Sequence, residues 1–449
     1  MKAVQHMGSL PVGKLLIRYS IPAIIGFVAN ALYQFVDRIL VGRGVGTLGV
    51  AAVTAAYPLS LVAMSLGLLV GTGTGNRIPM LLGQGDREGA ERVLGQGVRM
   101  ALWNGGILAL LTWVFTKPLL LACGCAPELL PLAIPFARIS AVGQIFLIVL
   151  ISMGNILRVQ GRPLTGLCIM LSSNVLNVGL AWTAIYGLHL GVTGTAIATS
   201  LAQAAGCLAV LAFVQGPSSA LRVRARFLRA DRPLAKTILA LGAPFGLMQL
   251  FGTLTFLAAN HGAAGQGGTV GIATLGVLNT VSMLLIYPSL GIMQAMQPLL
   301  GFNKGAGRLD RVYALLGRGL VSTLLLGAGF SAIVVFFPGQ VAGLFSKSDP
   351  ELVAMVRAGL PFFVLPVIFF GLEGTMSHYF LSMQVPRKAG LLLLGRQVLA
   401  IPLFLVLPRL FGFRAMYYVA PLASLPFATL ALVFMVRELS VLRRSRSAR

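Results

Sequence analysis

Apolar residues follow one another along this chain in long runs that short polar connections separate. Runs of about 20 residues match the length that a helix needs to cross the hydrocarbon core of a bilayer. We therefore predict an all-α membrane protein rather than a soluble fold. The predicted membrane-spanning helices are twelve in number and occupy residues 19–40, 52–80, 98–120, 129–157, 163–186, 192–215, 237–260, 270–300, 315–338, 358–382, 389–408 and 415–436.

The composition agrees with a membrane protein. Hydrophobic residues make up 57% of the 449 residues and charged residues 10%, whereas soluble domains contain about 45–50% and 25%. Residues 1–18 carry Lys2, Lys14 and Arg18, and no small-residue cleavage site follows the first apolar run. That run also contains Asp37, so we interpret it as a retained first helix and not as a signal peptide.

The formal net charge is +24, and its distribution along the chain indicates an orientation. Most of the 35 Lys and Arg residues lie in the N-terminal segment, in connections that follow even-numbered spans, in a central linker and in the tail. The positive-inside rule then places both termini in the cytoplasm of a bacterial inner membrane. The charges form no single basic face, which argues against a nucleic-acid partner and favours contact with anionic membrane lipid.

The second half of the chain repeats the first. Four pairs of residues stand 222 positions apart: Pro22 and Pro244, Gly49 and Gly271, Gly95 and Gly317, Gly97 and Gly319. The triplet 81–83 matches 299–301 at an offset of 218, which predicts four extra residues in the second copy after that point. Gln160 matches Gln384 at an offset of 224. Such a duplication is typical of transporters built from two pseudosymmetric bundles.

The duplication predicts the domain organisation. We expect an N-terminal six-helix lobe at 1–215, a cytoplasmic basic linker at 216–236, a C-terminal six-helix lobe at 237–437 and a basic cytoplasmic tail at 438–449. Both lobes have an even number of spans, so they insert in the same sense and frame a substrate path between them. No GxxxxGK[ST] motif occurs, so we expect a transporter driven by an ion gradient and not an enzyme.

The four cysteines do not indicate a cofactor. Cys168 and Cys207 lie in apolar runs, where cysteine is usually a packing residue. Cys123 and Cys125 are close together, but no further ligands with metal-site spacing accompany them. We therefore expect neither a metal site nor a bound cofactor.

Four segments of the sequence resemble one family of exporters. YQFVDRILVGRGVGTLGVAA at 33–52 is similar to the first-helix signature of the multidrug and toxic compound extrusion (MATE) family, and GTGTGNRIPMLLGQGDREGAERVLGQG at 71–97 to its second-to-third-helix connection. YGLHLGVTGTAIATSLAQ at 186–203 and GIMQAMQPLLGFNKGAGRLDRV at 291–312 resemble its sixth- and eighth-helix segments. The resemblance implies two bundles around a cavity and export of organic, often cationic, compounds in exchange for H+ or Na+.

Only two of the eleven acidic residues, Asp37 and Glu373, lie inside predicted spans. A carboxylate at this depth costs at least about 2.5–3.5 kcal/mol, so it persists where it faces a cavity, a partner or an ion. Arg38 is adjacent to Asp37, but neighbours in sequence do not share a helix face. The MATE resemblance implies that Asp37 is the cation-coupling carboxylate.

The resemblance carries over only in part to the rest of the cation site. Where the first lobe of a MATE protein binds the cation, the fifth helix supplies Asn followed four residues later by Asp, and the sixth helix supplies Thr. Here these positions hold Asn177, Ala181 and Thr199. Asp37 would then be the sole carboxylate of the site, which weakens Na+ binding more than proton binding and favours H+ coupling.

Glu373 is the second candidate for cation coupling. Some MATE branches place a coupling carboxylate in the tenth helix together with an acidic residue in the seventh. The seventh span has no acidic residue, and the position 222 residues after Asp37 is Ala259. Three interpretations of Glu373 stay open: it acts alone, it pairs with His378, or it bonds a neighbouring helix.

Several amides in the spans are candidates for substrate binding, namely Gln34, Asn155 and Asn174. Embedded amides also join helices, so this interpretation competes with a structural one. The predicted function is export of small amphipathic organic cations by a monomer. The alternative is a flippase for a lipid-linked precursor, which requires Arg38, Arg77 and Arg138 to face a common cavity.

Overall fold

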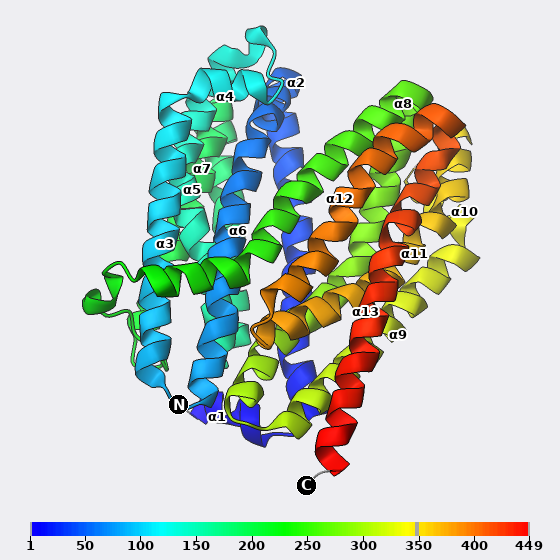
Figure 1. Ribbon diagram of the computed structural model, residues 1–449. Coiled ribbons are helices and arrows are strands. Elements are labelled where there is room, and N and C mark those ends of the chain that lie inside the picture. Colours follow the sequence, from blue (N-terminus) through cyan, green and yellow to red (C-terminus); the bar gives the residue numbers. More distant parts are fainter. Residues whose placement is uncertain (1, 346–349, 448–449) are drawn as a thin grey trace. The chain divides into compact units, whose positions relative to one another are not determined.

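The computed structural model describes residues 2–345 and 350–447, and this part of the chain is helical with short connections (Figure 1). The α-helices are α1 (Lys2–Ser9), α2 (Val12–Gly83), α3 (Arg87–Val114), α4 (Thr116–Ala122), α5 (Leu130–Val159), α6 (Pro163–Trp182), α7 (Gly191–Gln215), α8 (Arg232–Gly305), α9 (Leu309–Phe336), α10 (Pro338–Gly343), α11 (Pro350–Ser382), α12 (Pro386–Phe411) and α13 (Met416–Ser447). Four single turns complete the list: η1 (Pro127–Leu129), η2 (Thr183–Gly187), η3 (Ala225–Leu228) and η4 (Phe413–Ala415).

The two longest helices are each interrupted once. Gly46 breaks α2 with φ 78°, and Gly268 breaks α8 with φ 56°. Both values lie in the left-handed region that glycine adopts without steric cost. Within the described residues, eleven helical segments are long and apolar enough to cross a membrane, and one of these is the 74-residue α8. The break at Gly268 divides α8 into two spans, so the predicted all-α membrane protein with twelve spans is confirmed.

The backbone repeats itself at the offset that the sequence indicates. Helix α3 (Arg87–Val114) and helix α9 (Leu309–Phe336) begin 222 positions apart and also end 222 positions apart. The breaks at Gly46 and Gly268 have the same spacing. The two halves of the chain therefore share one backbone plan, down to the positions of their irregular residues.

The predicted changes of offset are corrected by this backbone. The helices α2 and α8 end at Gly83 and Gly305, again 222 positions apart, so the match at 218 was wrong and no four-residue insertion exists. The positive-φ residue after α5 is Gly161, and its counterpart after α11 is Gln384. Their spacing is 223, so the pairing of Gln160 with Gln384 was one residue out of register.

The helices form two compact units. The first contains Met1–Pro11, Ile25–Gln249 and Gly301–Arg308, and the second contains Val12–Ile24, Leu250–Leu300 and Leu309–Arg449. The lobe boundaries predicted at 215 and 237 remain predictions from the sequence. Helix α13 continues to Ser447, so most of the predicted tail 438–449 is helical, and its last two residues lie outside the described residues.

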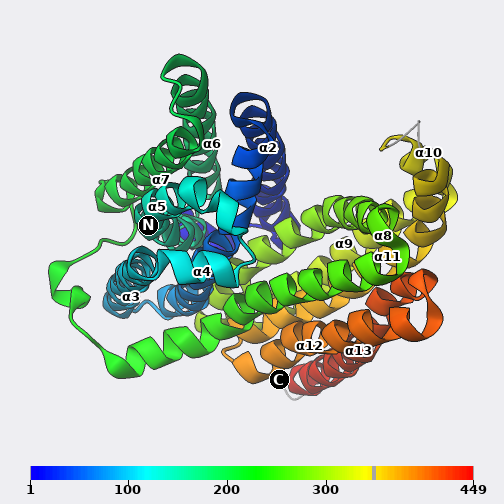
Figure 2. The ribbon, with the colours of Figure 1, turned by 90° about the horizontal axis from the view of Figure 1, so that it is seen from above.

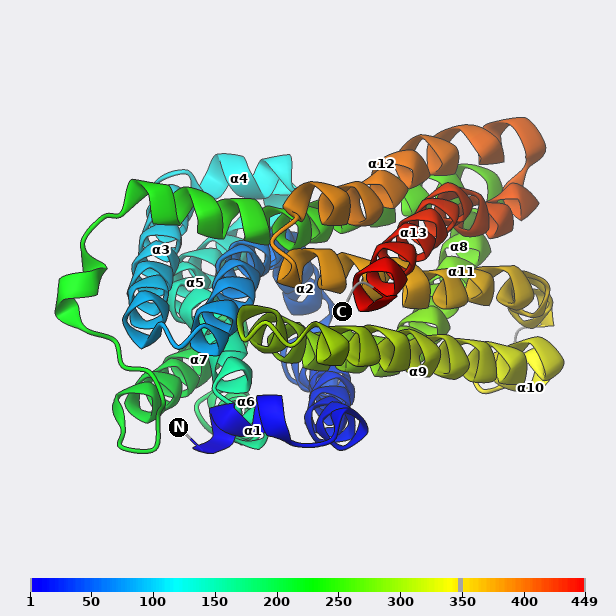
Figure 3. The ribbon, with the colours of Figure 1, turned by 60° about the horizontal axis from the view of Figure 1, so that its bottom comes forward.

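In the first unit, α5 packs against α3 on one side and α7 on the other, and α6 packs against α7 (Figure 2). Their apolar faces meet in a core that includes Leu94, Ile148, Met153 and Ile156, all fully buried. In the second unit, α11 packs against α9, α12 and α13 (Figure 3). Its core includes Leu278, Leu360, Val364 and Met416. The apolar side chains on the remaining helix faces are exposed, as expected for surfaces that meet lipid.

Small residues allow α2 and the start of α8 to approach closely within the first unit. A Cβ on Gly242 of α8 would collide with the carbonyl oxygen of Leu69 of α2, so only glycine fits there. Ser65 Oγ donates a hydrogen bond to the Gly246 carbonyl at 2.7 Å. Small residues and hydroxyl bonds of this kind join helices in a bilayer, where apolar side chains gain little from meeting each other.

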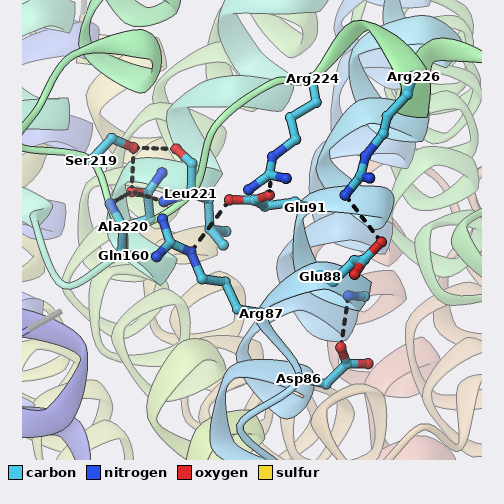
Figure 4. Close-up of polar contacts among 11 residues, drawn as sticks. Asp86, Arg87, Glu88, Glu91, Gln160, Ser219, Ala220, Leu221, Arg224 and Arg226 are labelled. Carbon is cyan, nitrogen blue, oxygen red and sulfur yellow. Dashed lines mark hydrogen bonds and ion pairs between the residues drawn. The ribbon is translucent and has the colours of Figure 1, made fainter.

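The linker before α8 is fastened to the first unit by ion pairs and hydrogen bonds (Figure 4). Glu91 of α3 is 1% exposed, and its carboxylate lies 2.7 Å from Arg224 Nε of the linker and 3.3 Å from Arg87 Nε. At the surface, Arg226 Nη2 lies 3.1 Å from Glu88 Oε1. Two linker arginines are therefore paired with carboxylates of α3.

A second set of bonds holds the beginning of the linker. Gln160 Oε1, at the end of α5, accepts hydrogen bonds from Ser219 Oγ at 2.7 Å and from the Ala220 backbone N–H at 2.8 Å. Phe227 of η3 is buried against Gly95 of α3. The linker is thus an ordered strap across the ends of α3 and α5.

The buried carboxylate predicts unequal effects of two linker substitutions. Arg224→Gln removes one of two cations from Glu91, and we expect a loss of about 1–3 kcal/mol in unfolding free energy, because the buried carboxylate keeps Arg87 but loses its shorter contact. Arg226→Gln removes an exposed pair, and we expect about 0–1 kcal/mol. Thermal unfolding of the purified protein in detergent measures both, and equal effects would contradict the central place of Glu91 in the strap.

Candidate functional site

Two of the predicted cation-site residues are in direct contact. Asn177 of α6 is 3% exposed, and its Nδ2 donates a hydrogen bond to Thr199 Oγ1 of α7 at 3.1 Å. The other amide atom, Asn177 Oδ1, is buried and has no hydrogen-bond partner among the described residues. Buried polar atoms without partners are rare and costly, so this oxygen is an acceptor available to a proton donor or a cation.

The helix geometry of α6 explains why Asn177 points at α7. Residues spaced by four lie on one helix face, and Ser173, Asn177 and Ala181 share the face that is buried. Ser173 Oγ donates to the Ala202 carbonyl of α7 at 2.8 Å, one turn before Asn177. Ala181, one turn after Asn177, is 1% exposed. The position where some MATE proteins hold a second carboxylate is therefore occupied by a buried methyl group.

Asp37 lies at a similar level of the same unit. Helix α2 contacts α6 at Gly26, which faces Met170, and contacts the following turn at Gly44, which faces Ile185. Measured back from the contact of Gly44 with Ile185, Asp37 lies seven residues or about 10 Å along α2, and Asn177 lies eight residues or about 12 Å along the α6 segment. Measured forward from the contact of Gly26 with Met170, Asp37 lies about one helical turn further along than Asn177.

The Asp37 side chain is partly buried, and among the described residues no hydrogen bond or ion pair involves its carboxylate. Arg38 beside it is exposed. Asp37 therefore has no direct ion-pair partner among the described residues, and the adjacent Arg38 acts on its carboxylate only through the longer-range attraction of charges.

The predicted substrate residues occupy different surroundings. Gln34 is exposed, three residues before Asp37 on α2. Asn174 is partly buried with an Nδ2 that has no hydrogen-bond partner, three residues before Asn177. Asn155 lies on α5, where its Oδ1 accepts a hydrogen bond from Arg158 Nη2 one turn later. Gln34 thus lies one turn before Asp37 on α2, and Asn174 lies one turn before Asn177 on α6. Asn155 is bonded within its own helix.

Glu373 lies in the second unit and has a partner that the sequence did not indicate. Its side chain is 2% exposed, and Oε2 lies 3.8 Å from Arg396 Nε of α12. The attraction between the two opposite charges is opposed by the cost of removing both from water, and Glu373 Oε1 is buried without a hydrogen-bond partner among the described residues. Glu373 contacts a neighbouring helix through Arg396, and His378 Nδ1 is 2.8 Å from the Gly374 carbonyl of its own helix. A role of Glu373 in cation coupling stays a prediction.

Arg396 was missed although the predicted span 389–408 contains it. Helix α12 begins at Pro386, so Arg396 lies ten residues after its start. An arginine inside a predicted membrane helix is itself a signal for an acidic partner, and this signal could have indicated Glu373.

The described residues contain no cluster of three or more His, Cys, Asp or Glu side chains that could hold a metal ion. Cys123 and Cys125 lie outside the spans as free thiols. Burial raises the pKa of the Cys125 thiol, and burial together with the neighbouring Cys125 raises the pKa of Cys123. Both sulfurs are therefore held in the protonated form, which is the less reactive one.

The three arginines that a flippase would need have different environments within the first unit. Arg138 Nε lies 3.4 Å from Thr116 Oγ1, and its guanidinium stands 5.2 Å from the Trp113 ring. Arg77 lines an open pocket of about 290 Å³ together with Arg92 and the helix-capping Asp86. Arg38 is exposed on α2. The contacts of these side chains give no sign of one shared anion site.

Comparison with known proteins gives relatives that span the whole chain. The multidrug export protein MepA of Staphylococcus haemolyticus is 24% identical over 422 residues, which cover 93% of this chain and 92% of that protein. MepA of Staphylococcus aureus is 24% identical over 438 residues, which cover 95% of each chain.

Solved structures with the same fold include two transporters. A MOP superfamily transporter from Pyrococcus furiosus superposes with a TM-score of 0.89 at 24% identity and covers 99% of each chain. A multidrug resistance MATE family transporter in an outward-facing conformation has a TM-score of 0.90 at 24% identity and covers 98% of this chain and 99% of its own. At this identity the likeness shows that the folds agree.

The MatE family model matches the chain twice, at residues 22–183 and 244–406. The two matches begin 222 positions apart, which is the offset found in the backbone between Gly46 and Gly268. Together they cover most of a multi-pass helical membrane protein with two homologous halves. The chain belongs to the MATE family of transporters.

Proposed function

We propose that this protein is a secondary active multidrug exporter that moves small amphipathic organic compounds, often cationic, in exchange for protons by alternating access. It would act as a monomer in a bacterial inner membrane with both termini in the cytoplasm. Family membership supports the class of protein, and the names of the Staphylococcus relatives support multidrug export. The observation that carries the coupling site is the buried Asn177 Oδ1, which has no partner among the described residues and lies within about one helical turn of the level of Asp37.

Asp37 can form a hydrogen bond to the Asn177 amide oxygen only when its carboxyl group is protonated. An ionised carboxylate only accepts hydrogen bonds, whereas a protonated carboxyl also donates one. Asn177 Oδ1 is an acceptor without a donor. Protonation of Asp37 would therefore supply the missing hydrogen bond and remove a cost of about 1–3 kcal/mol for an unsatisfied buried acceptor. Thr199 would hold the amide in place through its bond to Nδ2.

The residues present favour a proton over a sodium ion. Sodium sites in transporters use several oxygen ligands and a balancing charge. The face of α6 that carries Asn177 continues with the buried Ala181 instead of a carboxylate. One carboxylate, one amide oxygen and one hydroxyl match the needs of a proton site better, and sodium remains the alternative coupling ion.

The exchange cycle follows from where the proton enters and leaves. In the outward-open state a proton binds Asp37, the carboxyl bonds Asn177 and the substrate is released. In the inward-open state the proton leaves to the cytoplasm, and the ionised Asp37 attracts a new cationic substrate near Gln34 and Asn174. Each charge that crosses the membrane contributes about 2.3 kcal/mol per 100 mV, enough to sustain a large drug gradient. Asn155 and Glu373 are the remaining candidates for substrate binding and cation coupling.

The first prediction concerns Asp37→Asn, which removes the titratable group at nearly constant volume. In cells without their own pumps, we expect wild type to lower ethidium accumulation, and the variant to accumulate dye to the level of wild type treated with a protonophore. Glu128→Gln is the matched control, because it makes the same charge change at an exposed position in the single turn η1, before α5. Equal efflux by wild type and Asp37→Asn at matched membrane expression would refute the proposed site.

The second prediction tests the choice of ion. Ala181→Asp restores a carboxylate one turn from Asn177 on the same buried face. We expect ethidium efflux by this variant to become dependent on external Na+, because the site gains a ligand and a balancing charge. Ala181→Asn is the control of equal size without the charge. Sodium dependence of the wild type itself, at constant proton gradient, would overturn the preference for protons.

A further inference from the structure

One cavity of the first unit is lined by opposite charges that do not pair with each other. It has a volume of about 290 Å³ and lies where the end of α2, the start of α3 and the start of α8 meet, and its charged lining residues are Arg77, Arg92, Asp86 and Asp231. We propose that this cavity binds the headgroup of a membrane phospholipid that carries a primary amine. The phosphate bonds the two arginines, the ammonium bonds the two aspartates, and the acyl chain lies in an apolar groove further along α3.

The two arginines of the cavity have donors that the protein leaves unused. Arg77 Nε is buried and has no hydrogen-bond partner among the described residues, and Arg77 Nη1 is 3.9 Å from Met80 Sδ. Arg92 is exposed, and its Cζ stands 5.9 Å from the centre of the Phe227 ring of η3. Neither arginine forms an ion pair within this part of the chain. Guanidinium donors match the oxygens of a phosphate in charge and geometry.

The two aspartates are held in place by the helices that they cap. Asp86 Oδ1 accepts a hydrogen bond from the Gly89 backbone N–H at 2.8 Å, and Asp231 Oδ1 accepts one from the Leu234 backbone N–H at 3.0 Å. Each carboxylate keeps a second oxygen, because an ionised carboxylate can accept about four hydrogen bonds. Neither aspartate forms an ion pair with a described residue. The cavity therefore presents fixed acceptors to an ammonium group.

The balance of charges in the cavity favours a zwitterion over an anion. Two arginines and two aspartates give the lining no net charge. A purely anionic headgroup pairs with the arginines and is repelled by the aspartates, whereas a phosphate with a primary ammonium group satisfies both pairs. A trimethylated amine has no N–H to donate to a carboxylate, so a choline headgroup matches the cavity less well than an ethanolamine headgroup.

A groove on the same face of α3 has room for an acyl chain. Its volume is about 310 Å³, and it is lined by Leu102, Trp103, Gly106, Ile107 and Leu110. At 3.6 residues per turn, positions 92, 103, 106 and 110 lie within about 60° of one another around the helix. The groove begins ten residues after Arg92, or about 15 Å along α3. One leaflet with its headgroups is about 20 Å thick, so a lipid with its headgroup beside Arg92 reaches the groove.

Arg99 and Trp103 lie between the cavity and the rest of the groove. The Arg99 Cζ stands 5.9 Å from the centre of the Trp103 ring, and Trp103 is 60% exposed. Tryptophan is enriched where headgroups meet acyl chains. The exposed face of α3 thus changes from charged to aromatic to apolar, which is the order of headgroup, interface and acyl chain in a phospholipid.

Lipid binding by the purified, delipidated full-length protein tests the inference. Native mass spectrometry measures the affinities for phosphatidylethanolamine, phosphatidylglycerol and phosphatidylcholine with identical acyl chains, and for soluble O-phosphoethanolamine. Arg77→Gln/Arg92→Gln removes the phosphate donors. Asp86→Ser/Asp231→Ser removes the ammonium acceptors and keeps a residue that caps a helix.

Two further variants complete the set. Gly106→Leu fills the groove at a position where a Cβ meets no other atom within 4 Å. Arg409→Gln is the control, since it removes an exposed arginine from α12 of the second unit. Unfolding temperatures report whether each protein is intact. If the double arginine variant is unstable, Arg92→Gln alone keeps the test, because its side chain is exposed and forms no ion pair with a described residue.

We expect wild type and Arg409→Gln to bind phosphatidylethanolamine about tenfold more tightly than the other two lipids, because only its headgroup bonds both pairs of charges. The double arginine variant should weaken binding of phosphatidylethanolamine and phosphatidylglycerol alike. The double aspartate variant should lower the affinity for phosphatidylethanolamine to that for phosphatidylglycerol. Gly106→Leu should weaken binding of all three lipids and leave the affinity for O-phosphoethanolamine unchanged.

Three other results would overturn the inference. Tighter binding of phosphatidylglycerol than of phosphatidylethanolamine by wild type would make the cavity a site for an anionic lipid. Binding of O-phosphoethanolamine as tightly as the whole lipid would make its occupant a soluble molecule. Affinities that are the same in the two double variants as in Arg409→Gln would show that no headgroup binds there. The test does not depend on the proposed transport function, because no step of transport is measured.

Discussion

The absence of water inside a bilayer is the constraint on which this structure depends. Backbone amides must bond within the chain, and helices achieve this along their own length. Side-chain charges need compensation at the same depth. Glu373 satisfies the rule with Arg396 at 3.8 Å, and Asp37 does not, because no partner holds its carboxylate among the described residues. Under the proposed mechanism, the carboxylate of Asp37 is therefore where a proton has most to contribute.

The duplicated backbone allows the two halves to specialise without changing the fold. Gly46 and Gly268 interrupt the long helices at equivalent positions, and the next long helices, α3 and α9, both have 28 residues. Packing determines these features, and packing tolerates exchange of single side chains on inner faces when the volume is similar. At the offset of 222, Ala259 of the second half takes the position of Asp37 of the first, so the two halves differ in chemistry while they share one architecture.

The number and approximate positions of the membrane-spanning helices could be predicted from the sequence, because each helix coincides with a local run of apolar residues. Such runs are easy to recognise in a chain with 57% hydrophobic residues. The contact of Asn177 with Thr199 could also be anticipated, although only from the family resemblance. The pairing of Glu373 with Arg396 could not be fixed from the sequence, although the predicted span 389–408 contains Arg396, because it depends on how α12 lies against α11. The offset of 218 was wrong because it was based on one short repeated triplet, whereas the helix ends at Gly83 and Gly305 are 222 positions apart.

By itself the sequence determined the membrane environment, the number of spans, the internal repeat and the identity of the two embedded carboxylates. These properties follow from composition and from spacing along the chain, which need no contact between distant residues. The tertiary structure alone decided which polar atoms have partners: Asn177 Oδ1 has none among the described residues, the linker arginines bind Glu91 and Glu88, and Arg396 reaches Glu373. The packing of helices that are far apart in the sequence determines which polar side chains bond to each other. Because no water is available inside the bilayer, a polar atom that packing leaves without a partner is the one that can bind a proton or an ion.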